Sequence, residues 1–244
     1  MIIKFLKKKI KSLLLNYGYK ITKINKSHFN RYKTPSIELI NILRNCKGII
    51  HIGAHRGDEA HIYNWFGKKV IWYEANPEIF ESLKENISSF KEQMTINELL
   101  LDAAREEVEF FISNNDGASS SIFTFGELSV DPKKKIWKNR KLFMKKKILI
   151  KSNTLDKSLL ENDISINKFD HWVIDVQGSE LLLLKGAENS LKDCNSILIE
   201  VSQGEVYKDG AQVKEIQDYL NKKNFYAVQK LDSSHGDILF VKKN

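Results

Sequence analysis

The sequence predicts an α/β fold with a mostly parallel sheet whose last strand is reversed. Short apolar runs, typical of buried strands, alternate with helical patterns from Gly48 to Val201. Such alternation is typical of βαβ units, in which helices connect parallel strands. Two further strand patterns, Phe225 to Leu231 and Asp237 to Lys242, follow one another closely near the end of the chain and predict an antiparallel pair.

Length and composition predict one globular domain with an appendage. The chain has 244 residues, of which 42% are hydrophobic and 29% charged, as in ordinary globular proteins. Its two cysteines, Cys46 and Cys194, argue against a disulfide framework and favour a reducing compartment. No run approaches the roughly 18 apolar residues of a membrane span, and no secretion signal is recognisable. We therefore expect a cytoplasmic protein.

The net charge of +8 is unevenly distributed along the chain. Residues 1–33 contain ten Lys or Arg and no acid, and residues 133–151 contain ten more, again without an acid. The rest of the chain is therefore acidic, so we do not expect nucleic acid as a partner of the main body. The segment from Lys133 to Lys151 is interpreted as a solvated insertion, although its aromatic residues also suit an anionic glycan, a lipid surface or RNA.

Residues 1–34 are predicted to be an extension of a domain that spans residues 35–244. Apolar residues recur at helical spacing from Met1 to Tyr17 with lysines between them, which predicts a basic amphipathic helix. Such a helix packs either on protein, which is the favoured interpretation, or peripherally on an anionic membrane surface through residues 1–33.

The stretch from Gly48 to Pro77 has the pattern of a βαβ unit with a ligand-binding turn. A buried strand from Gly48 to Ile52 is followed by a glycine turn, a helix opening near Asp58, and a second strand from Val70 to Tyr73. The acid that ends this second strand, Glu74, can accept both hydroxyls of a ribose, so the unit suits a dinucleotide or S-adenosylmethionine (SAM). The turn lacks the Gly-x-Gly-x-x-Gly grip on a pyrophosphate, which favours SAM.

The other elements are expected in the following order. The first are a helix from Pro35 to Leu43, a helix opening at Pro77, a strand from Thr95 to Leu101 ending at Asp102 and Ala103, and a strand from Val108 to Ile112. Next come a turn region from Asn114 to Ser121, an edge strand from Lys147 to Lys151, and a segment from Ser152 to Leu160 that leads to a helix. The last are a strand from His171 to Asp175, a helix from Leu181 to Leu191, a strand from Ile197 to Val201, and a helix from Val213 to Lys223.

Acidic residues lie at or near the ends of two consecutive parallel strands. Asp175 ends one strand, and Glu200 lies near the carboxyl end of the next. Ligands of open α/β sheets bind at these carboxyl ends, so we expect the two carboxylates to converge on an acceptor. Asp175 is predicted to act as a base or as a ligand of Mg²⁺ or Mn²⁺, with Glu200 as its companion.

With these motifs the chain resembles the FkbM family of SAM-dependent methyltransferases over roughly Gly48 to Val241. The matching stretches are the turn from Gly53 to Gly57, Glu74-Ala75-Asn76-Pro77, Asn115 to Ser121, Asn153-Thr154-Leu155-Asp156, Ile174 to Glu180, Leu184-Lys185-Gly186-Ala187, and Ile199-Glu200-Val201. The stretch from Asp175 to Glu180, followed by Leu-Lys-Gly-Ala, is the specific part of the resemblance.

The resemblance implies a Rossmann-like, seven-stranded class I SAM methyltransferase fold and methylation of a hydroxyl group. The expected acceptor is a sugar, a nucleotide sugar or a glycan. The residues expected around SAM are Gly53, Ala54, Gly57, Asp58, Glu74, Ala75, Asn76, Asp102 and Ala103. The residues expected around the acceptor are Gln177, Glu180, Ser119, Ser120 and Ser121, beside the catalytic pair Asp175 and Glu200.

One position departs from the family pattern. Methyltransferases of this kind usually carry an acid two residues before the first glycine, where this chain has His51. Either Asp58 substitutes for that acid or SAM binds more weakly. Three functions therefore stay open: a sugar O-methyltransferase, which leads, an RNA methyltransferase that uses the basic segments, and a non-catalytic relative that binds a ligand or a partner.

Overall fold

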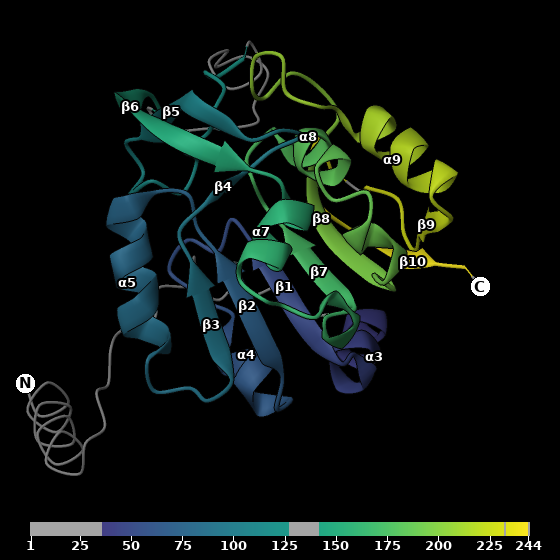
Figure 1. The fold of residues 1–244 in the computed structure, drawn as a ribbon. Helices are drawn as coiled ribbons and strands as arrows, with labels where there is room; N and C mark the ends of the chain where they lie inside the picture. Colours follow the sequence, from purple (N-terminus) through teal and green to yellow (C-terminus); the bar gives the residue numbers. More distant parts are fainter. Residues whose placement is uncertain (1–35, 127–141, 232, 244) are drawn as a thin grey trace, which may run out of the picture. The chain divides into compact units, whose positions relative to one another are not determined.

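The computed structural model describes residues 36–126, 142–231 and 233–243 (Figure 1). The predicted extension 1–34 and the part of the basic segment around Trp137 lie outside the described residues. The domain boundary at residue 35 therefore stays a prediction. The first described helix is α3 (Ile37–Asn45). None of the described helices is long and apolar enough to cross a membrane.

In the described part of the chain, seven strands form one sheet, which confirms the predicted fold class. Their order is β3 (Gln93–Ile96), β2 (Lys69–Tyr73), β1 (Gly48–Ile52), β7 (His171–Ile174), β8 (Ser196–Ser202), β10 (His235–Lys242) and β9 (Phe225–Ala227). The pairings from β3 through β8 are parallel, whereas β10 runs antiparallel to both of its neighbours. The reversed last strand is therefore where the sequence predicted it.

Helices cover both faces of this sheet, which explains why its central strands read as continuous apolar runs. On one face Ile50 and Ile52 pack in the main hydrophobic core with α7 (Leu155–Glu161), α8 (Glu180–Lys185) and α9 (Val213–Lys222). These three helices lie in front of the sheet in Figure 1. On the other face Trp72 stacks on His51 and lies near Tyr63 of α4 (Ala60–Trp65).

The helix α5 (Pro77–Ile87) begins as predicted at Pro77. Asn76 is its N-cap, because the side-chain oxygen of Asn76 accepts the backbone N–H of Glu78 at 3.1 Å. Proline fits the first helical position, where its missing N–H would have no partner within the helix. Leu83 and Ile87 then face the core.

The predicted strand from Thr95 to Leu101 is wrong as a single element. It divides into β3 of the main sheet and β4 (Leu99–Leu100), which belongs to a three-stranded sheet in the order β4-β6-β5. The chain turns between them because the side-chain amide of Asn97 donates to the carbonyl oxygen of Glu74 at 2.7 Å. Asp102 consequently follows β4, not the third strand of the main sheet.

Two more predictions concerning this smaller sheet need correction. The predicted edge strand belongs to β6 (Met144–Asn153), which is central because it pairs with both β4 and β5 (Arg105–Ser113). Part of the basic segment is therefore a strand and not an insertion. Its lysines form ion pairs, including Lys147 with Glu109 and Lys151 with Glu106, each at 2.5 Å.

The predicted helix from Leu181 to Leu191 ends early. Helix α8 stops at Lys185, and a 3₁₀ turn, η2 (Ser190–Lys192), follows. At Gly186 the backbone passes close to the smaller sheet, because a Cβ on Gly186 would lie 1.9 Å from the carbonyl oxygen of Leu101. Glycine is required there by the close approach of two backbones.

Two glycines with positive φ provide a test of the fold. Gly53 has φ +81°, and a Cβ there would lie 1.7 Å from the carbonyl oxygen of Asp175. Gly67 has φ +63°, but a Cβ there would meet nothing within 4 Å. We expect Gly67→Ala to lose about 1–2 kcal/mol of unfolding free energy from its backbone alone. Gly53→Ala should lose about 1–3 kcal/mol more, from forced displacement of β7.

Urea unfolding of the two variants measures this difference directly. Equal losses for the two substitutions would show that the turn and β7 are not in close contact.

Candidate active site

The glycine turn is fixed by protein contacts. The backbone N–H groups of Gly53 and Ala54 both donate to the carbonyl oxygen of Tyr73, at 3.0 and 2.9 Å. Gly53 leaves room for the end of β7, whereas Gly57, with φ +69°, leaves room for Leu83 of α5. The sequence predicted that both glycines allow the backbone to approach a ligand. Packing within the protein is enough to explain why each position is a glycine.

Glu74 lies at the carboxyl end of β2 with its carboxylate held by two backbone amides. One oxygen accepts the N–H of His55 at 2.8 Å, and the other accepts the N–H of Asn76 at 2.7 Å. Burial is the main reason that the pKa of Glu74 is raised from 4.5 to about 7. Each oxygen keeps further lone-pair capacity, so the carboxyl group can also receive a pair of hydroxyl groups. This arrangement fits the ribose of SAM.

The remaining residues expected around SAM are more scattered. Ala75 and Asn76 follow Glu74 directly, and Asn76 is 2% exposed. Asp58 is exposed in the turn two residues before α4. Asp102 forms an ion pair with Arg105 at 2.6 Å, and the carbonyl oxygen of Ala103 accepts the Ser152 hydroxyl at 2.9 Å. The residue that follows β3 is Asn97, which sequence reasoning missed because it treated the two strands as one.

His51 occupies the position of the family's usual acid but is part of the core. It is 4% exposed, stacks on Trp72 with ring centroids 5.1 Å apart, and its Nδ1 forms a hydrogen bond with the hydroxyl of Tyr63 at 3.2 Å. Burial is the main reason that its pKa is lowered from 6.5 to about 3. A neutral imidazole packed in this way takes no charge-based part in holding a cofactor.

The structure brings Asp175, Glu200 and Gln177 together at the carboxyl ends of β7 and β8. The side-chain nitrogen of Gln177 donates to Asp175 Oδ1, and also to Glu200 Oε2 at 2.6 Å. The side-chain oxygen of Gln177 accepts the hydroxyl of Tyr207. The predicted convergence of the two carboxylates is therefore present, and a glutamine amide lies between them.

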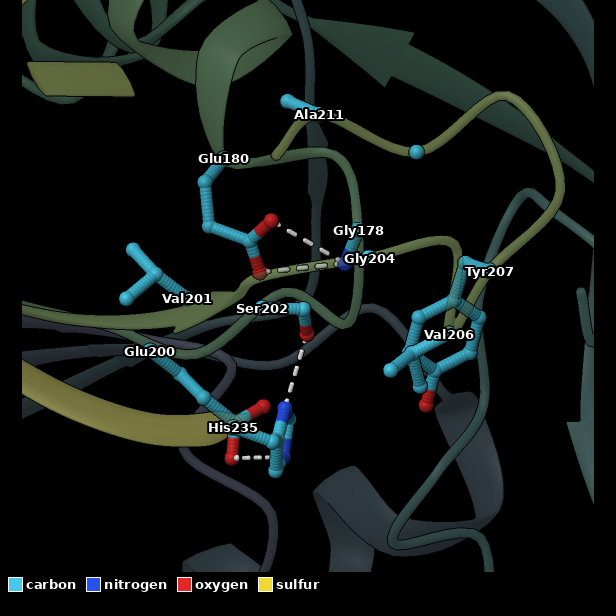
Figure 2. A pocket seen from close by; sticks show the side chains of 11 residues that line it. Gly178, Glu180, Glu200, Val201, Ser202, Gly204, Val206, Tyr207, Ala211 and His235 are labelled. Atoms are coloured by element: carbon cyan, nitrogen blue, oxygen red, sulfur yellow. Dashed lines mark hydrogen bonds and ion pairs between the residues drawn. The ribbon is translucent and has the colours of Figure 1, made fainter. Parts of the chain in front are cut away.

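A shallow pocket lies next to this cluster, and its empty space, open solvent included, is about 280 Å³. Glu180 enters it from α8, Glu200 and His235 from β8 and β10, and Tyr207 from the loop after β8, as Figure 2 shows. No lysine or arginine is among the described residues that line it. Tyr207 was not predicted as a site residue because its loop carries no periodic sequence pattern.

Glu180 and His235 are held in place by specific hydrogen bonds. Glu180 Oε1 accepts the backbone N–H groups of Val176 and Gly178, at 3.2 and 3.1 Å, so this acid stabilises the loop before α8. His235 Nε2 lies 3.0 Å from Glu200 Oε1, and its Nδ1 lies 2.8 Å from the hydroxyl of Ser202 (Figure 2). His235 therefore orients Glu200 on the side opposite to Gln177.

The serine run is buried beside the same cluster. Ser119, Ser120 and Ser121 are 4%, 9% and 1% exposed. The hydroxyl of Ser121 donates to the backbone carbonyl of Gln177 at 2.7 Å, and the hydroxyl of Ser120 accepts the backbone N–H of Ser113 at 3.2 Å. These hydroxyls support the loops of the site, and their predicted contact with an acceptor stays a prediction.

Burial raises the pKa values of Asp175, Glu180 and Glu200. Glu180 and Glu200 have pKa values raised to about 7 and about 8. The pKa of Asp175 is raised well above its usual value by burial, and further by the nearby charge of Glu200. These groups therefore hold protons near neutral pH, and one of the Asp175–Glu200 pair becomes a base when it ionises.

The donor set does not fit a divalent metal ion. Asp175 and Glu200 are the predicted ligands, but oxygens of both are already engaged by Gln177, and one oxygen of Glu200 by His235. Among the described residues no group of three His, Cys, Asp or Glu side chains is arranged to hold a metal. Mg²⁺ and Mn²⁺ prefer several oxygen ligands, which this donor set does not supply.

One protein-family model matches most of the chain. The model described as the methyltransferase FkbM domain matches residues 51–226, a range that includes the glycine turn, Glu74 and the Asp175 cluster. No curated protein matches the sequence.

Solved structures with a similar fold include several methyltransferases. The chain is similar to TrmK of M. capricolum in complex with S-adenosylhomocysteine, with 12% identity over 86% of this chain and 70% of that one and a TM-score of 0.43. It is also similar to magnesium protoporphyrin IX methyltransferase of Synechocystis PCC 6803 with bound SAM, with 7% identity over 97% of each chain and a TM-score of 0.46. An rRNA methylase of Streptococcus thermophilus has 8% identity over 87% of this chain and 99% of that one, with a TM-score of 0.45. Likenesses of this size do not identify an acceptor.

Replacing Glu74 tests whether its carboxyl group binds the cofactor. We expect Glu74→Ala to weaken SAM binding by about 1–3 kcal/mol, because buried hydrogen bonds to the ribose are lost. Glu78→Ala is the matched control, since Glu78 lies four residues away on the exposed side of α5. Calorimetry with SAM measures both. Unchanged affinity in Glu74→Ala, or preferential binding of NAD, would contradict the assignment.

The raised pKa of Glu180 predicts a pH dependence of stability. Between pH 4.5, where the group ionises in the unfolded chain, and about 7, where it ionises in the fold, the folded state binds more protons. The free energy of unfolding therefore falls as pH rises through this window. Glu180→Gln keeps an oxygen for the amides of Val176 and Gly178 but has no proton to lose. We expect it to reduce the loss of stability between about pH 5 and about pH 8 by about 1–3 kcal/mol.

Urea unfolding at several pH values measures this loss. Parallel pH curves for the wild type and Glu180→Gln would show that Glu180 ionises normally in the fold.

Proposed function

This chain belongs to the FkbM-domain family of SAM-dependent methyltransferases, and we propose that it methylates a hydroxyl group of a sugar or glycan-type acceptor, with Asp175 as the base. The observation that carries the proposal is the carboxylate pair Asp175 and Glu200, joined by Gln177 beside the acid-lined pocket. Such a pair supplies what a hydroxyl acceptor needs, because a neutral hydroxyl must lose its proton as it is methylated.

The cofactor supplies a methyl group on a positively charged sulfur, and the acceptor oxygen forms a bond to that carbon while the electrons of the carbon–sulfur bond return to the sulfur. Glu74 would bind the ribose hydroxyls of the cofactor. Asp175, in its ionised form, receives the hydroxyl proton of the acceptor. Glu200 lines the pocket and faces the acceptor from the neighbouring strand.

In this proposal most of the lowering of the activation barrier comes from positioning the acceptor next to the methyl group. Holding an acceptor oxygen in line with the reacting carbon contributes about 7–11 kcal/mol in well-oriented systems. Asp175 lies between the two halves of the site, because its backbone touches the glycine turn and its carboxylate belongs to the acceptor cluster. A base at this junction is within reach of an oxygen that approaches the methyl group.

The lining of the pocket favours an uncharged hydroxyl compound over RNA. Phosphate groups bind preferentially to lysine and arginine, and the described lining has neither. In the described part of the second basic segment, Lys147 and Lys151 are already paired with carboxylates. Their charge is therefore partly neutralised within the protein.

A panel of acceptors tests the proposal. Release of S-adenosylhomocysteine is measured with free hexoses, pentoses, oligosaccharides, nucleotide sugars and RNA, and we expect turnover with a member of the sugar classes. Methylation of RNA with strong dependence on salt would favour the alternative in which the basic segments bind RNA. Failure to bind SAM would indicate a non-catalytic relative.

The substitution Asp175→Asn separates chemistry from folding. Asparagine keeps the volume and the hydrogen-bonding capacity but cannot accept the proton, so turnover on the active sugar should fall by about 10²–10⁴. SAM affinity should stay close to that of the wild type, and the melting temperature should not fall, because asparagine removes a buried acid whose pKa is raised by burial. Asp193→Asn, on an exposed residue, is the matched control. Nearly full turnover in Asp175→Asn would reject Asp175 as the base, and Glu200→Gln would then be tested in its place.

A further inference from the structure

Gln177 has an amide whose hydrogen-bond donors are both used inside the protein. Its nitrogen has two N–H groups, one for Asp175 Oδ1 and one for Glu200 Oε2 at 2.6 Å. Its oxygen accepts the hydroxyl of Tyr207. In this pattern the nitrogen side of the amide faces both carboxyl groups and the oxygen side faces the hydroxyl of Tyr207. The residue is 9% exposed, so few of its atoms are available to an acceptor.

The backbone of Gln177 is held in an unusual conformation that aims the amide at the carboxylates. Its φ is +56°, a left-handed conformation that residues other than glycine rarely adopt. The carbonyl oxygen of Gln177 accepts the Ser121 hydroxyl at 2.7 Å, and the next residue, Gly178, has φ +103°. Such conformations persist only when the surrounding contacts hold them, and they concentrate at functional sites.

A neutral donor between two carboxylates has a specific chemical consequence. A lysine or arginine there would form an ion pair and hold the carboxylates ionised far below neutral pH, which would weaken them as bases. A glutamate would add a third negative charge. A glutamine donates one hydrogen bond to each carboxylate without supplying a charge or a proton. These hydrogen bonds orient both groups and lower their pKa values, but burial outweighs them and keeps the pKa of each group raised.

We infer that Gln177 is a positioning residue, which orients Asp175 and Glu200 toward the acceptor through its two N–H groups and does not itself contact the acceptor. This inference rests on the proposed function, because it assigns Gln177 a role in the same carboxylate pair. It replaces the expectation from the sequence that Gln177 binds the acceptor. Tyr207 completes the arrangement by fixing the oxygen end of the amide.

The first test needs no acceptor. In nitrogen-15 NMR spectra of the full chain, the Gln177 side chain should give one amide pair whose two protons are both shifted by hydrogen bonding and exchange slowly with water. Gln177→Met identifies this signal by removing it. Asp175→Asn and Glu200→Gln should each shift a different proton of the pair. A Gln177 amide that exchanges rapidly, or that responds to neither substitution, would overturn the inference.

The second test separates positioning from acceptor binding. Gln177→Met and Gln177→Glu have similar length and the same backbone constraint, but neither presents two neutral N–H donors. With the most active sugar of the panel, we expect kcat to fall about 10- to 100-fold in each, the size of effect that small misplacements produce, with KM for the sugar changed little. A raised KM with unchanged kcat would show that Gln177 contacts the acceptor instead.

A control in the same loop identifies a merely structural effect. Ser179 is 1% exposed, and its hydroxyl donates to the carbonyl oxygen of Val176 at 3.1 Å. Ser179→Ala should lower the melting temperature with kcat unchanged. If the Gln177 variants behave in the same way, Gln177 only supports the loop and the inference fails.

Asp175→Asn is assayed in parallel. This variant distinguishes a failure of the proposed base, Asp175, from a failure of the proposed role of Gln177. Full turnover in Asp175→Asn would reject the proposed base. Lost turnover in Asp175→Asn with full turnover in Gln177→Met would reject only the role of Gln177.

Discussion

The contact on which the site depends is the packing of the glycine turn against the end of β7. The backbone N–H of Asp175 donates to the carbonyl oxygen of Ile52 at 2.9 Å, and the carbonyl of Asp175 occupies the space that a side chain on Gly53 would need. Parallel neighbours end at the same edge of a sheet, so the proposed cofactor side and the proposed acceptor side meet at one backbone contact. Transfer between two bound molecules requires a fixed distance between their sites, and in the proposed function this contact would set it.

The loop of residues 114–121 is a second link between the two sides. His55 of the glycine turn donates from Nε2 to the carbonyl oxygen of Asp116 at 2.9 Å. At the other end of the loop, the hydroxyl of Ser121 donates to the carbonyl oxygen of Gln177 at 2.7 Å. These two hydrogen bonds connect the glycine turn to the loop before α8 through residues 114–121, and the buried hydroxyl of Ser121 forms part of that connection.

Local patterns in the sequence predicted most of the sheet, and long-range contacts explain what they missed. The strands around Ile52, Tyr73 and Ile174 are buried on both faces and are short, so their apolar runs were sufficient to find them. The apolar run from Thr95 to Leu101 was wrongly predicted as one strand. It is divided at Asn97, whose side-chain amide donates a hydrogen bond to the carbonyl oxygen of Glu74, directly after β2. Asp175 and Glu200 follow from strand ends, whereas the contact of Tyr207 with the cluster depends on the path of a loop, which has no local signature.

The buried acids connect the stability of the fold to the proposed reaction. Burial raises the pKa values of Glu74, Glu180 and Glu200 to about 7, 7 and 8, so ionising these groups in the folded protein is unfavourable near neutral pH. A positive charge placed nearby lowers such pKa values. By thermodynamic linkage, ionisation of these acids and binding of a cationic sulfur compound favour each other. In the proposed reaction the base is therefore most available while the positively charged methyl donor is bound, and the neutral sulfur product no longer favours its ionised form.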